Sequence, residues 1–136
     1  MTDQPTRIWP QLAVRRGREA VAWYGEAFGA VVDYQVGGTD DAPEIVAQLS
    51  VGDAVFWVSD EAPDHGNHSP ESLTGGTVRM ALIVDDPRAL FARAIAAGAR
   101  EVWPVSEEYG WVLGRVEDPY GHAWEIGRPP DDWPHR

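Results

Sequence analysis

The sequence predicts an α+β fold in which one βαβββ module, a strand followed by a helix and three more strands, occurs twice. Three observations predict it. The length of 136 residues suits one domain. Apolar side chains alternate over residues 8–14, as in a half-buried strand, and the same parity returns 70 positions later over 78–84. In each half, one helical stretch and three short strand-like segments follow.

The first module is expected over residues 7–59. In its helix, Ala20, Tyr24 and Phe28 fall on one face, and Gly29 is suited to end the helix because glycine adopts the left-handed conformation without strain. The three later strands are expected near residues 31–36, 44–50 and 53–59, with a tight turn at residues 51–52.

The second module is expected over residues 78–128. Asp86 can cap its helix, Pro87 suits the first helical position, and Gly98 can end the helix. Its later strands are expected near residues 101–106, 111–117 and 122–127. Residues 60–77 hold several Pro, Gly and charged residues and are expected to form an irregular surface connection, and residues 129–136 an irregular tail.

The composition excludes several kinds of chemistry. The chain has no Cys, which excludes disulfides, thiolate zinc sites and Cys nucleophiles. All eleven basic residues are Arg, so no Lys is available to form a Schiff base. Acidic residues outnumber basic ones 22 to 11, and the resulting net charge of -11 disfavours DNA or RNA as a partner. The seven Trp are a high number for a chain of this length.

The sequence does not indicate a membrane partner. Its longest uninterrupted apolar stretches, such as residues 80–84, are far shorter than the roughly 20 residues that a membrane-spanning helix needs. Residues 1–5 carry neither the basic nor the apolar region of a signal peptide. A cytoplasmic location is therefore expected.

Several short motifs carry a resemblance to a known superfamily. They are PQLAV at 10–14, WYGEAFGA at 23–30, SPESL at 69–73, VDD at 84–86, LFARA at 90–94, GRV at 114–116 and DPYGH at 118–122. Their order and spacing resemble the vicinal-oxygen-chelate superfamily, and most closely its PhnB-like glyoxalase/bleomycin-resistance protein branch. The resemblance implies a cupped, eight-stranded mixed sheet with helices outside and a ligand cavity inside. It also implies a homodimer, commonly with a cavity to which both chains contribute.

In this superfamily the metal ligands come from the first and last strands of each module. The matching first-strand positions are Trp9 and Arg79. The matching last-strand positions are Phe56 and Glu125, which differ by the same offset of 69 at which the small residues Gly52 and Ala54 recur as Gly121 and Ala123. Only Glu125 could hold a divalent metal, because Trp, Phe and Arg side chains offer no lone pair, and a shift to Gln11 adds only a weak amide oxygen. We therefore expect no metal site and no cofactor.

An interior carboxylate such as Glu125 needs a partner, since burial of an unpaired charge is costly. Arg79 comes from the strand expected to face Glu125 across the cup. We therefore expect an ion pair between Arg79 and Glu125 at the position that the superfamily gives to its metal. The alternative, in which Arg79 reaches solvent at the cavity mouth, stays open.

The aromatic side chains divide into two expected groups. Those expected in the core between sheet and helices are Trp23, Trp57 and Trp124. Those expected on the cavity wall are Trp9, Phe56, Tyr109 and Trp111, where aromatic faces suit planar or cationic ligands. The alternative, in which the second group only fills the cup or an interface, stays open. His65 and His68 are expected to be exposed, and His122 to have a structural role on the helix-facing side.

The sequence favours a small-molecule binding protein over an enzyme. We expect it to bind or sequester a small, cationic aromatic molecule, as superfamily members that confer antibiotic resistance do with a drug. The expected ligand-binding residues are Trp9, Gln11, Phe56, Arg79, Tyr109, Trp111 and Glu125. Two alternatives stay open. One is a metal-dependent glyoxalase- or dioxygenase-type lyase or oxidoreductase, and the other is a cavity-bearing dimer that has lost its ligand.

Overall fold

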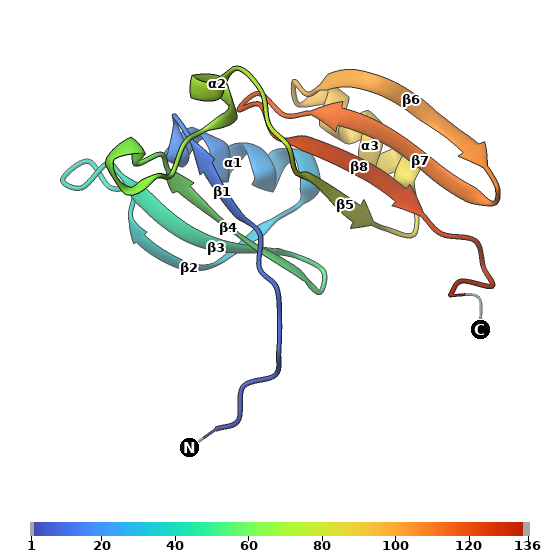
Figure 1. Ribbon diagram of the computed structural model, residues 1–136, viewed down its shortest axis with the longest axis horizontal. Coiled ribbons are helices and arrows are strands. Elements are labelled where there is room, and N and C mark those ends of the chain that lie inside the picture. The colour runs from blue at the N-terminus through green and yellow to red at the C-terminus, as the bar shows by residue number, and fades with distance from the viewer. Residues whose placement is uncertain (1, 135–136) are drawn as a thin grey trace.

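The computed structural model describes residues 2–134 and contains the two expected modules (Figure 1). The first consists of β1 (Gln11–Val14), α1 (Gly17–Phe28), β2 (Val31–Gly37), β3 (Ile45–Val51) and β4 (Ala54–Asp60). The second consists of β5 (Arg79–Ile83), α3 (Pro87–Ala96), β6 (Arg100–Glu108), β7 (Trp111–Glu117) and β8 (Ala123–Arg128). The α+β fold class with two βαβββ modules is thereby confirmed.

Each module forms its own mixed sheet of four strands. The strand order is β1-β4-β3-β2 in the first sheet and β5-β8-β7-β6 in the second. In both sheets the outer pair, β1 with β4 and β5 with β8, is parallel and the other pairs are antiparallel. Across residues 2–134, strand pairing stays within a module, so the eight strands form two adjoining sheets instead of one continuous sheet. Helices and side chains make the contacts between the modules.

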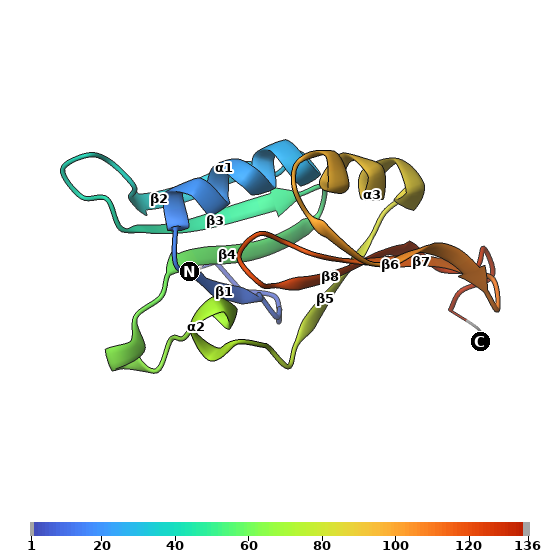
Figure 2. The same cartoon turned by 90° about the horizontal axis from the view of Figure 1, so that it is seen from above.

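Both long helices cover the same side of the molecule (Figure 2). Helix α1 packs on β3 and β4, α3 packs on β7 and β8, and the two helices contact each other. The core lies between helices and sheets and includes Leu12, Val14, Tyr24, Phe28, Leu49, Val58, Leu82, Phe91, Trp124 and Ile126. The opposite side of the two sheets carries no long helix and is called the open face below. Figure 1 looks onto this face.

The helix ends agree with the local sequence signals. Asp86 Oδ1 accepts a hydrogen bond from the Ala89 N–H at 3.1 Å and caps α3, and Pro87 occupies the first turn. Helix α1 ends at Gly29, whose φ of 71° lies in the left-handed region that suits glycine. Arg16 precedes α1 and gives it no side-chain cap, but Asp60 Oδ1 on β4 accepts the Gly17 N–H at 2.8 Å, and burial of its apolar face also stabilises this helix.

Side chains from both modules meet at Asp118, which is buried in the turn between β7 and β8. Its carboxylate accepts hydrogen bonds from the Tyr24 hydroxyl on α1 and from Trp124 Nε1 on β8. It also accepts the backbone N–H groups of Tyr120 and His122, each at 2.9 Å. Burial raises the pKa of Asp118, and burial likewise raises the pKa of Tyr24 well above its usual value. These bonds fix the second module against α1.

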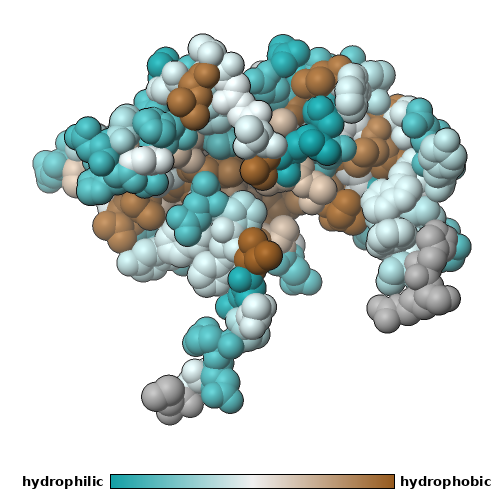
Figure 3. Space-filling view, in the orientation of Figure 1, coloured by the Kyte–Doolittle hydropathy of each residue, from teal (hydrophilic) through white to brown (hydrophobic). Residues whose placement is uncertain are grey.

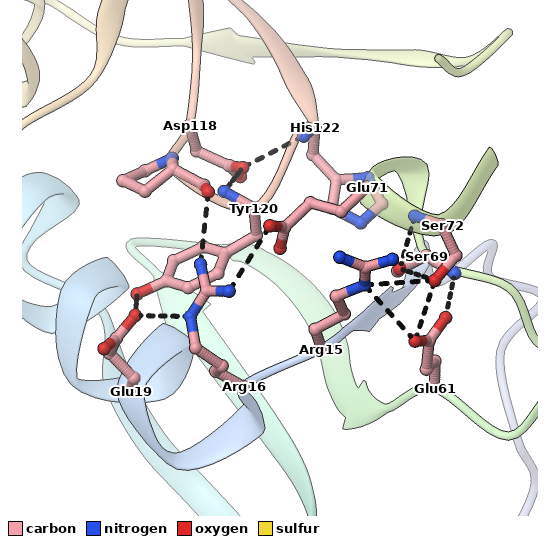
Figure 4. Close-up of polar contacts among 11 residues, drawn as sticks. Arg15, Arg16, Glu19, Glu61, Ser69, Glu71, Ser72, Asp118, Tyr120 and His122 are labelled. Carbon is pink, nitrogen blue, oxygen red and sulfur yellow. Dashed lines mark hydrogen bonds and ion pairs between the residues drawn. The ribbon is translucent and has the colours of Figure 1, made fainter. Parts of the chain in front are cut away.

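The connection between the modules is more ordered than expected. It contains a short 3₁₀ helix, η1 (Pro63–His65), and one turn of α-helix, α2 (Pro70–Leu73). Ser69 is fully buried, and its hydroxyl accepts the Ser72 N–H at 3.2 Å as a helix cap. Glu61 accepts the Ser69 N–H at 3.0 Å and the Ser72 hydroxyl at 2.9 Å, which holds the pKa of Glu61 below its usual value (Figure 4). A local polar network therefore orders part of this connection.

Over residues 2–134, no helix combines the length and the apolar character that crossing a lipid bilayer requires.

Candidate functional site

An aromatic patch covers the open face of the first module. We define it as Trp9, which precedes β1, Tyr34 on β2 and Trp57 on β4. The Trp57 ring lies 6.2 Å from the Trp9 ring and 6.0 Å from the Tyr34 ring, centroid to centroid. Gln11 is the parallel-ladder partner of Trp57 and lies on the same face. The patch offers exposed aromatic surface on which a planar molecule can stack.

The open face of the second module carries charged residues, which we call the arginine cluster: Arg79, Arg100, Arg115, Glu117 and Glu125. Arg79 Nε donates to Glu125 Oε1, so the expected Arg79–Glu125 ion pair is confirmed. Arg115 Nη2 lies 3.6 Å from the same carboxylate oxygen. Arg100 Nε donates to Glu117 at 3.1 Å. The cluster therefore places three guanidinium groups and two carboxylates on one sheet face.

Sequence reasoning missed Arg115 as a partner of Glu125. The two residues face each other across the antiparallel β7–β8 hairpin, whose last pair is Glu117 with Ala123. Counting outward from the Asp118 turn reaches the Arg115–Glu125 pair, so the hairpin register was a usable signal. The Arg115 guanidinium also lies over the Trp103 ring, 4.1 Å from its centroid. Bulges in the β6–β7 ladder shift the register near Trp103, so this contact had no simple signal.

Two adjoining cavities open beside the connection between the modules. One, of about 310 Å³, lies over the second module and is lined by the three arginines of the cluster. The other, of about 320 Å³, lies over the first module and is lined by Gln11, Ser59 and His68. Residues 75–78, together with Pro70 and His122, belong to the walls of both. Figure 3 shows this face, on which apolar side chains form separate patches between polar ones.

The expected position of Phe56 on the cavity wall is wrong. Phe56 is buried on the helix-facing side, where its ring lies 5.4 Å from Tyr24 and 5.3 Å from Trp124 in edge-to-face contacts. Trp57, expected in the core, lies on the open face instead. The expected core positions of Trp23 and Trp124 are confirmed.

The reversal of Phe56 and Trp57 has its cause in the length of the turns. In the first module Gln11 pairs with Trp57, and in the second Ala81 pairs with Glu125. The offset between modules is therefore 70 for the first strands and 68 for the last ones. The offset of 69 taken from the small residues differs from the true offset of 68 by one residue. Because side chains alternate between the two faces of a strand, this shift of one residue assigned every side chain of β4 to the wrong face. A run of five apolar residues at 54–58 hides the alternation of β4 itself.

The remaining predicted residues do not share one cavity. Trp9 lines a shallow cavity at the start of β4, together with Ile8 and Ala54. Tyr109 and Trp111 lie at the far end of the β6–β7 hairpin and line a cavity of about 490 Å³. Within one chain, the structure therefore brings together Arg79 and Glu125 but separates them from the aromatic residues that were expected beside them.

His122 lines both adjoining cavities on the open face rather than lying on the helix-facing side that was expected. Its Nε2 lies 2.9 Å from the Ala13 carbonyl oxygen on β1. Nearby, Arg16 bonds Glu19, which holds the pKa of Glu19 below its usual value, and the Tyr120 hydroxyl donates to the same carboxylate at 3.0 Å. These contacts join the turn after β7 to the start of α1.

The open-face residues do not fit a divalent metal. A centre of this kind needs three or four nitrogen or oxygen ligands. Among the four residues of the Gln11–Trp57 and Ala81–Glu125 pairs, only the Glu125 carboxylate and the weakly binding Gln11 amide oxygen have suitable lone pairs. Glu125 is already engaged by two guanidinium groups. In the part of the chain that the structure describes, no three His, Asp or Glu side chains gather where they could hold a metal.

Comparisons with solved structures agree with this fold. The chain superposes on TioX from Micromonospora sp. ML1 with a TM-score of 0.68 and 27% identity, covering 90% of this chain and 95% of that one. It superposes on the fosfomycin resistance protein FosX from Listeria monocytogenes, solved with Mn(II) and sulfate, with a TM-score of 0.68. That match covers 96% of this chain and 97% of FosX at 11% identity, so it shows the fold alone.

Sequence comparisons give the family. The uncharacterized proteins Mb0911c of Mycobacterium bovis and Rv0887c of Mycobacterium tuberculosis are each 36% identical over 124 residues. The match covers 88% of this chain, 81% of Mb0911c and 72% of Rv0887c. The model of the Glyoxalase/Bleomycin resistance protein/Dioxygenase superfamily matches residues 7–126. The chain therefore belongs to the glyoxalase/bleomycin resistance protein/dioxygenase superfamily.

Proposed function

We propose that this protein binds a small aromatic molecule on its open face and uses no resident metal to do so. The observation that carries the proposal is the state of Glu125. At the position where the superfamily places a metal ligand, this carboxylate holds Arg79 and lies 3.6 Å from Arg115. The positive charges of these two guanidinium groups repel a divalent cation, and Arg79 already bonds one of the two carboxylate oxygens. The open face is then suited to binding and sequestering a molecule rather than to metal-assisted catalysis.

The aromatic patch supports the proposal that the ligand is an aromatic molecule. Trp9 and Tyr34 are exposed on either side of Trp57, so an incoming ring can stack against them and exclude water. Family members include resistance proteins, and FosX is one that shares this fold. Sequestration of a toxic aromatic compound is the role that we propose for this chain.

A second copy of the chain would complete the binding cavity. The aromatic patch and the arginine cluster lie over different sheets, and Trp9 lines a different cavity from the three arginines within one chain. Exposed apolar side chains, Val36 and Val46, flank Tyr34 on the open face. A partner that placed its own open face against this one would cover these side chains and bring both kinds of binding group together.

Metal content and fluorescence quenching test the binding proposal. The purified protein should contain far less than one equivalent of any divalent metal by elemental analysis. Planar aromatic compounds should quench its Trp fluorescence saturably. The Trp57→Leu variant should lose this response, whereas Trp111→Leu removes a Trp from the other end of the molecule and should keep it. Stoichiometric metal, or saturable quenching that is unchanged in Trp57→Leu, would overturn the proposal.

Sedimentation measurements test whether two copies of the chain associate. The wild-type chain should sediment at twice its 15.0 kDa mass. Val46→Glu places a charge on the open face and should shift the protein to the monomer mass. Ala92→Glu places the same charge on the exposed surface of α3 and should leave the mass unchanged. A monomeric wild type would contradict the role of the second copy without affecting the metal and quenching results.

A further inference from the structure

We infer that the cavity over the second module is an anion site that takes the carboxylate group of a small organic ligand. The inference rests on the proposed binding function and names the charged group of the molecule bound. It concerns the cavity of about 310 Å³ whose wall includes the three arginines of the cluster.

The arginine cluster concentrates positive charge in an acidic chain. Arg79, Arg100 and Arg115 come from three different strands, β5, β6 and β7, yet line one cavity. They are three of only eleven basic residues, in a chain of net charge -11. Glu117 is bonded by Arg100, and Glu125 is shared by the other two. Three cations against two anions leave an excess of one positive charge at the cavity.

Arg115 differs from the other two arginines in having a buried donor without a partner. Its Nε is buried, and among the described residues it has no hydrogen-bond partner. The distance of 3.6 Å between Nη2 and Glu125 is an ion-pair contact and too long for a hydrogen bond. A buried N–H without an acceptor costs free energy, so a ligand that supplied an acceptor here would be bound favourably.

Trp103 contacts the Arg115 guanidinium without accepting a hydrogen bond from it. The guanidinium carbon lies 4.1 Å from the centroid of the Trp103 ring, a cation–π contact that engages none of the N–H donors. A guanidinium edge presents parallel N–H donors at the spacing of the two oxygens of a carboxylate. A ligand carboxylate would supply the missing acceptor and balance the excess charge.

A cationic ligand is disfavoured in this cavity, although the net charge of the chain attracts cations at long range. Charges farther away than roughly 8–10 Å are screened by physiological salt, so the groups at contact distance decide. Here those groups are three guanidinium ions, and the two carboxylates beside them are already paired. The local charge therefore points to an acidic group on the ligand, opposite to the cationic group that the aromatic residues suggested.

Three compounds that share one ring test the site: benzoate, benzyl alcohol and benzylammonium. Binding to the whole isotope-labelled chain is followed through the NMR signals of the Arg Nε–H groups, and the signal missing in Arg115→Lys identifies Arg115. Benzoate should shift this signal saturably. Benzyl alcohol should bind at least about tenfold more weakly, because it lacks charge-assisted hydrogen bonds, and benzylammonium should not shift the signal.

Variants then assign the site to Arg115. Arg115→Gln should weaken benzoate binding by about tenfold or more. Arg115→Lys keeps the charge but loses the planar fork, and should have an intermediate affinity. Arg88→Gln removes the same charge from the exposed side of α3 and should leave the affinity unchanged.

The failure of this inference can be told apart from the failure of the proposed function. No benzoate binding, equal affinity for benzoate and benzyl alcohol, or a preference for benzylammonium would each overturn the anion site. Undiminished benzoate binding by Arg115→Gln would overturn it too, because the carboxylate would then bind elsewhere. None of these results bears on metal content or on Trp57-dependent quenching, which decide the proposed function.

Discussion

At the scale of single residues, the buried carboxylate of Asp118 contributes to the stability of both modules. It is almost completely buried and accepts four hydrogen bonds, from two side chains and two backbone groups. Asp118→Asn replaces one acceptor oxygen with an N–H₂ group that faces N–H and O–H donors. We expect it to lower the free energy of unfolding at neutral pH by about 1–3 kcal/mol, measured by urea denaturation.

The same residue gives a pH dependence with a definite sign. Burial raises the pKa of Asp118, so the folded protein keeps a proton that the unfolded chain has already released above about pH 4. The contribution of Asp118 to the free energy of unfolding therefore falls as pH rises through this window. Asp118→Asn does not titrate, and the gap in stability between wild type and variant should widen as pH falls from 7 towards 4. A gap that narrows would contradict the raised pKa.

The opposite faces of Phe56 and Trp57 give a second test at this scale. Phe56→Ala removes a ring packed between Tyr24 and Trp124 and should cost about 3–5 kcal/mol of unfolding free energy. Trp57→Ala removes a larger ring from the open face and should cost less than half as much. Thermal and urea denaturation of the two variants would compare them. An equal or larger loss in Trp57→Ala would place Trp57 in the core.

Side-chain direction could be predicted from sequence wherever apolar and polar residues alternate. On β1 and β5, Leu12 and Leu82 lie in the core as their alternation indicates, and on β8 Trp124 and Glu125 lie on opposite faces as expected. On β4 every residue from 54 to 58 is apolar, so only the strand pairing shows which face each side chain occupies. The sequence therefore predicted the face of Glu125 but not that of Trp57.

At the scale of elements, the two long helices are stabilised in different ways. Helix α3 has a side-chain cap from the residue before it, Asp86. The residue before α1 gives no cap, but the Asp60 carboxylate of β4 accepts the Gly17 N–H, and α1 is more deeply buried. Asp86→Ala should lower the free energy of unfolding by about 1 kcal/mol. Asp85→Ala changes an adjacent exposed carboxylate that caps no helix, and serves as the matched control. Equal effects of the two substitutions in urea denaturation would show that charge, rather than capping, matters here.

The elements themselves were largely predictable, because their start and stop signals are local. Asp86, Pro87 and Gly29 marked helix ends from the sequence alone. The helix at 70–73 was missed because its stability depends on Ser69 and on Glu61, which lies nine residues before the helix begins. An interaction of that range leaves no periodic pattern in the chain. A segment rich in Pro and Gly then reads as irregular even where it is ordered.

At the scale of the whole molecule, the modules should unfold together. Tyr24 bonds Asp118 across the junction, Phe56 packs on Trp124, and Trp23 Nε1 donates to the Ala97 carbonyl at 2.8 Å. Neither module can lose its fold without exposing the other. Urea denaturation followed by Trp fluorescence and by far-ultraviolet circular dichroism should give one coincident transition. Two separate transitions would show that each module is stable alone.

The assembly of the site was the least predictable feature. The resemblance implied one cavity for seven residues, but the structure distributes them over several surfaces of one chain. Which strands lie side by side follows from the repeat, whereas the relative placement of the two sheets depends on contacts between residues more than 90 positions apart, such as Tyr24 and Asp118. Contacts of such separation have no signal in a single sequence.

Residues 75–78 form most of the wall that the two central cavities share. A Cβ atom added at Gly75 or Gly76 would meet nothing within 4 Å apart from the adjoining residues of the chain, so neither glycine is packed against the rest of the protein. Deletion of both glycines should admit larger rings, which calorimetry with fused-ring acids would detect, and unchanged size selectivity would refute this. Ligand range in such a protein could thus diverge between relatives through the length of one loop, while both sheets stayed the same.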